Sequence, residues 1–329
     1  MAEQDDERDP RNKNKRPTEA TDHEGSAHVS DSGGAELASS ENSLLSEVSP
    51  DIAPAVEEFM EQAAQQNEAA AEAVPDVRNK PGSYISFEHV HKSFGDFVVL
   101  DDVSFCVNSG ETLCIMGRSG VGKSVSLQML LGFLKPDKGI IRVGGEDICG
   151  LNERELQAIR RKVTMVFQNG ALFDSVSVGE NVAFPLRERG ELAEEQILQV
   201  VKGLLEMVGV AGMEDLLPSD LSTGMKRSVA IARALAAQPE AILYDEPTTM
   251  VDPLMAHLLG DLIERLKQQL HLTSIVVTHD TRFAKKLADR VVLLHGGKAH
   301  FFGTMDEMEQ SDDPILKEFL ALDELTVPA

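Results

Sequence analysis

Apolar positions are spread unevenly along the chain, and they separate an amino-terminal stretch from the remainder near residue 83. From Tyr84 to Val107, short apolar runs broken by polar turns predict antiparallel strands. From Leu113 onward, short apolar runs alternate with segments whose apolar spacing suits helices. The pattern is mostly helical between about residues 170 and 225, with helices expected at Val178–Arg187, Ala193–Val208 and Gly212–Leu217. The pattern as a whole predicts an α/β fold with a mainly parallel core sheet, an antiparallel β subdomain and an α-helical subdomain.

Residues 1–82 differ from residues 83–329 in charge and in apolar content. The stretch from Met1 to Lys80 holds 19 acidic and 7 basic residues, a net charge of −12, which is half of the −24 of the whole chain. Such a segment buries little apolar surface, so we expect a mostly disordered extension. A transient helix is expected from about Asp51 to Val74, because this run is rich in Ala and Glu and Pro75 follows it. The extension is interpreted either as a docking or regulatory tail or as a solvated tail without a fixed partner.

The stretch Gly117–Ser124 matches the phosphate-binding pattern G-x-x-x-x-G-K-[ST]. An apolar run precedes it and helical spacing follows it, which is the strand–loop–helix context that the motif requires. Its glycines allow main-chain N–H groups to point at phosphate oxygens, and the helix N-terminus adds partial positive charge. Lys123 can reach the β- and γ-phosphates, and the Ser124 hydroxyl can ligate Mg²⁺. The predicted nucleotide-binding residues are Gly117, Arg118, Ser119, Gly120, Val121, Gly122, Lys123, Ser124 and Val125.

A second motif is the apolar strand that ends in Asp245 and Glu246. A carboxylate at the C-terminal tip of a buried parallel strand lies where ligands bind in such sheets, and Asp245 can hold Mg²⁺ there. Glu246 can act on an attacking water during phosphoryl transfer. The alternative is that either carboxylate merely caps a helix.

Four further stretches occur in an order that fits these two motifs. Gln168 ends a predicted strand, Leu221–Met225 precedes a predicted helix that carries Arg227, and His279 ends the strand after Glu246. Phe94 lies upstream of the phosphate loop, where an aromatic ring could stack on a nucleotide base. Taken alone, Phe94 is equally well a core residue, and a lone histidine at a strand end is more often structural.

This order of motifs resembles that of the ATP-binding subunit of ABC transporters, from about Tyr84 to the C-terminus. The resemblance identifies Gly117–Ser124 as the Walker A motif and Ile242–Glu246 as the Walker B strand with its catalytic glutamate. The other matches are the Q-loop Gln168, the signature motif Leu221–Met225, the D-loop Met250–Asp252, the switch histidine His279 and the adenine-stacking Phe94.

The resemblance implies an ATPase that binds ATP and Mg²⁺. It implies catalytic roles for Lys123, Gln168, Glu246 and His279, and nucleotide contacts from Phe94, Ser222, Gly224 and Asp252 in addition to the phosphate loop. It implies Mg²⁺ ligation by Ser124, Gln168 and Asp245.

The signature stretch departs from the family's LSGGQ, because Thr223 replaces a glycine and Met225 replaces the glutamine. A signature of the form L-S-x-G-M followed by basic residues resembles the ATPases of Mla/Mce-type lipid transport systems. The flanks of Gln168, from Val166 to Leu186, and the tail from Ser311 to Phe319 also look like that subfamily.

The family resemblance implies a head-to-tail dimer in which Ser222 and Gly224 of one copy cover the ATP held by the other, and Asp252 couples the two sites. It also implies an integral-membrane permease partner, with an Mce-domain substrate-binding protein possible in the lipid-transport subfamily. The chain itself would lie at the cytoplasmic face of the inner membrane as a peripheral subunit.

Charge and length restrict the remaining functional classes. A net charge of −24 argues against nucleic-acid binding, which requires a basic surface. No apolar run approaches the ~20 residues that span a bilayer. The alternatives that remain are the ATPase of a polar-solute importer, for example of amino acids, a soluble non-transport ABC ATPase, and a non-hydrolysing regulator. The intact Lys123, Asp245, Glu246 and His279 argue against the last of these.

Overall fold

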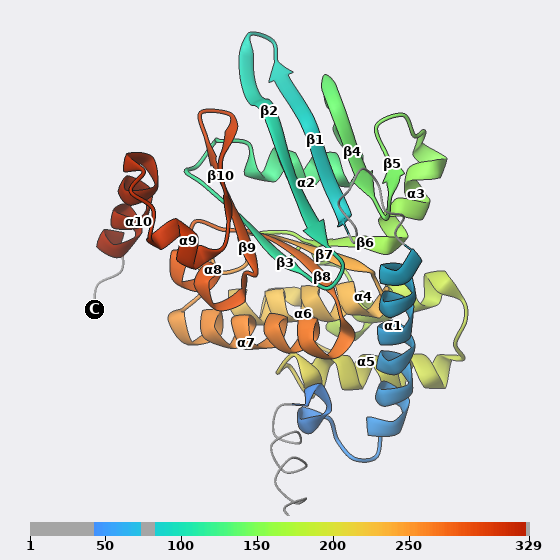
Figure 1. Cartoon of the computed structure of the whole chain (residues 1–329). Coiled ribbons are helices and arrows are strands. Elements are labelled where there is room, and N and C mark those ends of the chain that lie inside the picture. The colour runs from blue at the N-terminus through green and yellow to red at the C-terminus, as the bar shows by residue number, and fades with distance from the viewer. Residues whose placement is uncertain (1–42, 74–82, 327–329) are drawn as a thin grey trace, which may run out of the picture. The chain divides into compact units, whose positions relative to one another are not determined.

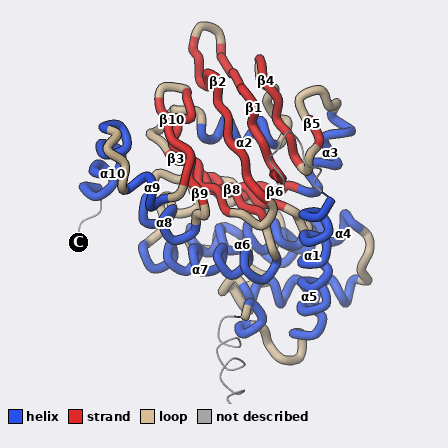
Figure 2. Tube along the Cα trace, in the orientation of Figure 1, coloured by secondary structure: helices blue, strands red, loops and turns tan. Residues whose placement is uncertain are grey.

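A computed structural model describes residues 43–73 and 83–326. Two sheets organise these residues, and Figure 2 shows the strands gathered on one side and most of the helices on the other. The predicted α/β class, with separate antiparallel and helical parts, is confirmed. Residues 1–42, 74–82 and 327–329, which include most of the predicted disordered extension, lie outside the described residues.

The larger sheet has six strands in the order β10-β9-β3-β8-β7-β6. Five of these strands pair in parallel, and β10 pairs antiparallel with β9. The strands are β3 (Thr112–Met116), β6 (Val163–Val166), β7 (Ala241–Asp245), β8 (Thr273–Val277), β9 (Arg290–His295) and β10 (Lys298–Gly303).

The central strands are apolar on both faces because both faces are covered. On β3, Leu113 and Ile115 belong to one apolar cluster, whereas Cys114 and Met116 belong to the other. This alternation follows from the two-residue period of a strand. The helices α7 (Pro253–Leu270) and α8 (Thr281–Leu287) cover one face, and the chain continues into α9 (Met305–Glu309) and α10 (Pro314–Thr326).

A smaller antiparallel sheet has the order β2-β1-β4-β5. Together with α2 it encloses the second apolar cluster (Figure 1). Its strands are β1 (Ser83–Phe94), β2 (Phe97–Asn108), β4 (Lys138–Val143) and β5 (Glu146–Asp147), and the adjoining helices are α2 (Lys123–Leu130) and α3 (Glu153–Lys162). Asn152 caps α3 in a capping box with Glu155.

The helical part between the two nucleotide motifs contains α4 (Val178–Arg189), α5 (Glu194–Met207), η2 (Pro218–Asp220) and α6 (Thr223–Ala236). The predicted helix at Gly212–Leu217 is wrong, because these residues form turns. Their carbonyl groups bond outside the segment: Glu214 accepts from Gly179 and Leu216 accepts from Val178 at 2.8 Å each. The segment therefore satisfies the free N–H groups at the start of α4 instead of forming its own helix.

Residues 43–73, which we call the N-terminal segment, form η1 (Leu44–Glu47) and α1 (Ala53–Ala73). The predicted helix is present and packs one face against the rest of the chain, so the expectation of disorder does not hold for these residues. Val56, Phe59 and Met60 are buried in the same cluster as the helical part. Figure 1 shows α1 beside α5, and the segment contacts both α5 and α7.

Polar contacts seat this segment at several points along its length. Glu206 of α5 accepts from the Ser49 N–H at 2.6 Å and from its hydroxyl at 3.0 Å. Asn67 is buried, and its side-chain amide donates to the Leu270 carbonyl at the end of α7 over 2.8 Å. The N-terminal segment thus joins a helix of the helical part to a helix of the core. Within the described ranges no helix is long and apolar enough to cross a membrane.

Candidate nucleotide site

The phosphate loop connects β3 to α2, and its main chain adopts conformations that favour glycine. Gly117 has φ 146° and Gly122 has φ 104°. A Cβ at Gly117 would lie 2.6 Å from the Leu294 carbonyl oxygen, and a Cβ at Gly122 would lie 2.7 Å from Leu100 Cδ2. Both positions therefore require glycine, so the loop can curl in front of the N-terminus of α2, where free N–H groups suit an anion.

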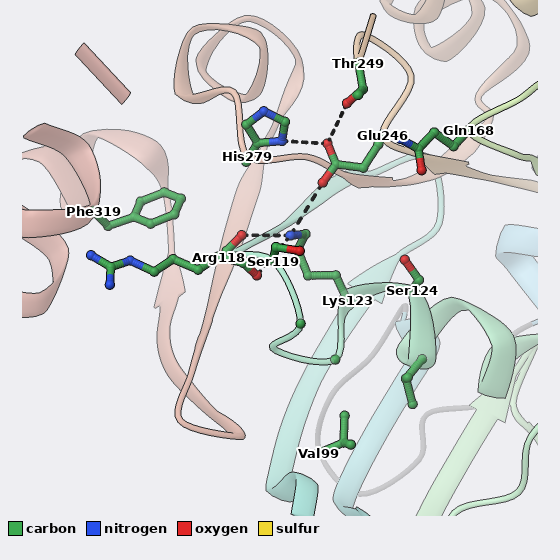
Figure 3. Close-up of a pocket in the computed structure, with 14 residues that line it drawn as sticks. Val99, Arg118, Ser119, Lys123, Ser124, Gln168, Glu246, Thr249, His279 and Phe319 are labelled. Carbon is green, nitrogen blue, oxygen red and sulfur yellow. Dashed lines mark hydrogen bonds and ion pairs between the residues drawn. The ribbon is translucent and has the colours of Figure 1, made fainter. Parts of the chain in front are cut away.

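This loop forms one wall of a cavity of about 650 Å³, a size typical of small-molecule sites (Figure 3). The cavity collects predicted residues from four separate parts of the chain, because the C-terminal ends of parallel strands meet at one edge of the sheet. The predicted residues that line it are Gly117, Arg118, Ser119, Gly120, Gly122, Lys123, Ser124, Val125, Gln168, Glu246 and His279.

Glu246 lies at the centre of the polar contacts in this cavity (Figure 3). Its Oε2 pairs with His279 Nδ1 at 2.8 Å and accepts from the Thr249 hydroxyl at 3.2 Å. Its Oε1 lies 3.5 Å from Lys123 Nζ. Lys123 Nζ also donates to the Gly117 and Arg118 carbonyls at 2.8 and 3.2 Å. The ammonium group is therefore held by acceptors that phosphate oxygens would replace.

Ser124 and Asp245 bring two oxygen ligands together beside the loop. The Ser124 hydroxyl donates to Asp245 Oδ1 at 3.1 Å. Burial raises the pKa of the Asp245 carboxyl above its ordinary value, and the neighbouring Glu246 adds to the rise. A carboxylate that is partly desolvated beside a second carboxylate favours a cation, and hydroxyl and carboxylate oxygens are the ligands that Mg²⁺ prefers. These residues therefore fit a magnesium ion.

The helix-cap alternative for Asp245 and Glu246 is wrong in this structure. The next helix, α7, is capped by Asp252, whose side chain accepts from the Met255 N–H at 3.0 Å. Glu246 instead occupies the left-handed region at φ 49° and points into the cavity.

Six of the predicted residues do not line the cavity: Phe94, Val121, Ser222, Gly224, Asp245 and Asp252. Asp245 reaches the site through Ser124, as described above. Ser222 is exposed and caps α6, with its hydroxyl 3.3 Å from the Met225 N–H, whereas Gly224 is buried against Met255. Phe94 is 49% exposed at the tip of the β1–β2 hairpin. Its ring contacts Lys92 Nζ at 5.4 Å.

Three lining residues were not predicted: Val99, Thr249 and Phe319. Thr249 was detectable in principle, because it follows Glu246 by one turn and carries a hydroxyl. Val99 and Phe319 carry no chemical signal, since an apolar residue in a strand or a terminal helix is ordinarily read as core. Phe319 reaches the cavity because α10 is tied to the phosphate loop by the ion pair of Glu318 and Arg118 at 2.8 Å.

Comparisons with known proteins agree with this geometry. The ABC transporter family model matches residues 100–249. The chain is 43% identical over 226 residues to the intermembrane phospholipid transport system ATP-binding protein MlaF of Haemophilus influenzae, covering 69% of this chain and 86% of that protein. It is 36% identical over 245 residues to the probable ribonucleotide transport ATP-binding protein mkl of Mycobacterium leprae, covering 74% and 71%.

A solved structure of a dimeric ATP-binding cassette, in a post-hydrolysis state with ADP and Pi, is 31% identical with a TM-score of 0.63. The match covers 67% of this chain and 98% of that one. The resemblance inferred from the order of motifs is thus confirmed by overall sequence and by fold. The chain belongs to the ABC transporter family and is an ATP-hydrolysing cassette.

Proposed function

We propose that this chain powers a membrane transporter that moves phospholipids or related lipids between membranes. The observation that carries the proposal is the identity to the phospholipid transport ATPase MlaF over most of that protein's length. The departures in the signature stretch, Thr223 and Met225, support the same assignment.

The contacts in the cavity support a role for each of its central side chains. Lys123 neutralises charge on the β- and γ-phosphates, and Glu246 orients the attacking water while His279 holds the Glu246 carboxylate. Gln168, which lines the cavity, monitors the γ-phosphate. Phe94 lies outside the cavity at the tip of the β1–β2 hairpin, and the family resemblance alone supports its stacking on the adenine. Ser124 and Asp245, with Gln168, hold Mg²⁺, which when bound supplies positive charge to the phosphate oxygens. Catalysis by this set is mainly positioning and electrostatic stabilisation.

A second copy of the chain completes the site. Ser222 and Asp252 are exposed and lie outside this chain's own cavity, which is the arrangement expected if they face the nucleotide of a partner. Gly224, although buried here, lies in the first turn of the same helix as Ser222 and would move with it. A head-to-tail pair makes two equivalent sites with closed two-fold symmetry.

A permease partner docks on the helical part near Gln168. Phe167, Phe173 and Phe184 are 39%, 47% and 45% exposed there, and the rings of Phe173 and Phe184 contact each other at 5.3 Å. Exposed aromatic groups of this kind mark protein interfaces. In this proposal the ATPase is peripheral at the cytoplasmic face of the inner membrane, and an Mce-domain protein receives or supplies the lipid.

The substitution Glu246→Gln tests the site. It keeps the size and the hydrogen-bonding oxygen of the side chain but removes the charge, so we expect hydrolysis to fall roughly 100-fold or more. ATP should then remain bound, and ATP-dependent dimers should accumulate in size-exclusion chromatography with light scattering. A variant that hydrolyses ATP at the parental rate and stays monomeric with ATP contradicts the assigned roles.

The transported substrate is tested separately, by purifying the chain from native membranes and identifying its partners by mass spectrometry. We expect a permease with co-purified phospholipid, and ATP-dependent transfer of labelled phospholipid when the complex is reconstituted between vesicle populations. A polar-solute permease, or ATP-dependent uptake of ribonucleotides or amino acids instead of lipid transfer, would favour the importer reading and contradict the lipid proposal.

A further inference from the structure

Helix α6 starts at the signature stretch and carries a buried arginine just over one turn farther along. Ser222 caps the helix, and Arg227 is 3% exposed. The two terminal nitrogens of its guanidinium group donate to the main-chain carbonyls of Pro247 and Thr249. These carbonyls belong to the loop that follows Glu246, so α6 is attached directly to the loop that carries the glutamate.

That loop contains two residues in a conformation that non-glycine residues rarely adopt. Glu246 has φ 49° and Met250 has φ 61°. Such a conformation is strained, and it persists only where the surroundings hold it. Within the loop the supporting bonds are long, with 3.3 Å from the Thr249 N–H to the Glu246 carbonyl and 3.2 Å from the Val251 N–H to the Thr248 carbonyl. The two carbonyls held by Arg227 lie between the two strained residues.

The Thr249 side chain links the main chain that Arg227 holds to the Glu246 carboxylate. The Thr249 hydroxyl donates to Glu246 Oε2, the same oxygen that pairs with His279 (Figure 3). A shift of Thr249 would therefore change the direction in which the carboxylate points. Arg227 acts on Glu246 through Thr249 and does not touch it in any described hydrogen bond or ion pair.

The burial of Arg227 is poorly explained by stability alone. Its Nε is buried without a hydrogen-bond partner, and burial lowers the pKa of its guanidinium group, which the nearby Glu246 carboxylate partly offsets. A buried cation with an unmet donor is an expensive structural element compared with an apolar side chain of similar volume. Its planar fork, however, holds two carbonyls through two separate nitrogens at a fixed spacing, whereas a lysine offers a single nitrogen and an apolar residue offers no donor.

We propose that Arg227 is a positioning residue that fixes the Pro247–Thr249 loop so that Glu246 presents its carboxylate to the water at this chain's own site. The inference deepens the proposed function and rests on the role given there to Glu246. Because α6 begins at Ser222, the same arginine connects the stretch that covers the partner's ATP to the glutamate of this chain. ATP bound at one site of the dimer is thereby linked to catalysis at the other.

Arg227→Met tests this in the full-length chain, because methionine keeps an unbranched buried side chain but removes all donors. We expect the hydrolysis rate at saturating ATP to fall roughly 10- to 100-fold, as small misplacements of reacting groups do. The dissociation constant for ATP should stay within about twofold, since no ATP contact is lost. Arg227→Lys, which keeps the charge but offers one nitrogen in place of two at a fixed spacing, should recover only part of the rate.

Arg189→Ala is the matched control. This guanidinium group donates to the Ala237 carbonyl at 3.3 Å and to Gln238 Oε1 at 2.6 Å, at the opposite end of α6 and outside the cavity. It should leave hydrolysis unchanged. If Arg227→Met keeps the parental rate per folded molecule, or if Arg189→Ala lowers the rate equally, the positioning role is wrong.

A double-variant cycle separates positioning from a general structural effect. If Arg227 acts through Glu246, then adding Arg227→Met to Glu246→Gln should not lower the residual rate further, measured as single-turnover phosphate release from labelled ATP. A further tenfold drop in the double variant would show that Arg227 acts independently and would overturn the proposal. Parental activity of Glu246→Gln alone would instead overturn the proposed role of Glu246, and with it this inference.

Discussion

Two regions of the molecule hold their residues by opposite means. One is the nucleotide cavity, and the other is the seat of the N-terminal segment, by which we mean the surface of α5 and α7 that α1 contacts. In the cavity, charged groups contact one another and strained main chain, as in the contacts of Glu246 with His279 and Lys123. In the seat, apolar side chains fill a continuous cluster, and polar contacts such as that of Glu206 with Ser49 join the segment to the neighbouring helices. The cavity is therefore arranged for a ligand, whereas the seat is complete within one chain. Changes in the cavity should affect activity, and changes in the seat should affect stability.

Lys123→Ala should produce the largest effect of any single change, and on activity alone. The ammonium group lies 3.5 Å from Glu246 Oε1, and the resemblance implies that it contacts the phosphates. We expect hydrolysis to fall roughly 1,000-fold, comparable to the loss of a preorganised donor to a developing charge. The measurement is phosphate release at saturating ATP, with Lys202→Ala on α5 as the control. If Lys123→Ala lost as much thermal stability as the variants of the N-terminal segment described below, the cavity and the seat would not differ in the way proposed.

Phe59→Ala should have the largest effect on stability. Phe59 is 6% exposed in the cluster shared by the N-terminal segment and the helical part, so its removal leaves a cavity. We expect about 3 kcal/mol lower free energy of unfolding, measured with urea. Phe97→Ala, at a side chain that is 65% exposed, should change it by less than about 0.5 kcal/mol. Hydrolysis per folded molecule should stay at the parental value, and a proportional loss of hydrolysis would mean that the two regions are coupled.

The same contrast explains what the sequence could and could not predict. Gly117 and Gly122 are recognisable because a phosphate loop requires glycine at fixed spacing, and the structure shows the atoms that exclude any other residue. Lys123, Glu246 and His279 were placed correctly relative to one another because parallel strand ends converge at one edge of a sheet. Chemistry that depends on local spacing is therefore readable in the chain.

Packing that depends only on apolar contact cannot be predicted from the sequence in the same way. The helix around Val56 and Phe59 was predicted, but an Ala- and Glu-rich helix fits solvent as well as it fits a groove, and nothing local identifies its seat. Phe319 was not predicted to line the cavity for the same reason, because an apolar residue in a terminal helix carries no specific signal. The turns at Gly212–Leu217 were missed because their carbonyls serve the start of α4, which is a tertiary effect that overrides helical spacing.

Gly203→Ala tests the packing of α1 on α5, because a substitution that usually raises the free energy of unfolding should lower it here. Within a helix this change ordinarily stabilises by about 0.5–1 kcal/mol. Here the new Cβ would lie 2.0 Å from Val56 Cγ2 of α1, and a β-branched side chain in a helix has little freedom to move. We expect a loss of about 2 kcal/mol in the free energy of unfolding. Adding Val56→Ala should restore most of this loss relative to Val56→Ala alone, and a stabilising Gly203→Ala would contradict the close packing of α1 on α5.

Asn67→Ala should give the smallest effect on stability, and it tests a buried hydrogen bond between α1 and α7. The Asn67 amide donates to the Leu270 carbonyl, which ends α7 and has no continuing helix to bond with it. Alanine leaves that carbonyl buried without this donor, so we expect a loss of about 1 kcal/mol in urea unfolding. Gln65→Ala, two residues earlier on the exposed face of α1, loses no buried bond, and it gains less helix propensity than Asn67→Ala because glutamine is a better helix former than asparagine. A lower stability of Asn67→Ala than of Gln65→Ala therefore sets a lower bound on the Asn67 contact, whereas a higher stability of Asn67→Ala would mean that apolar packing alone holds α1 against α7.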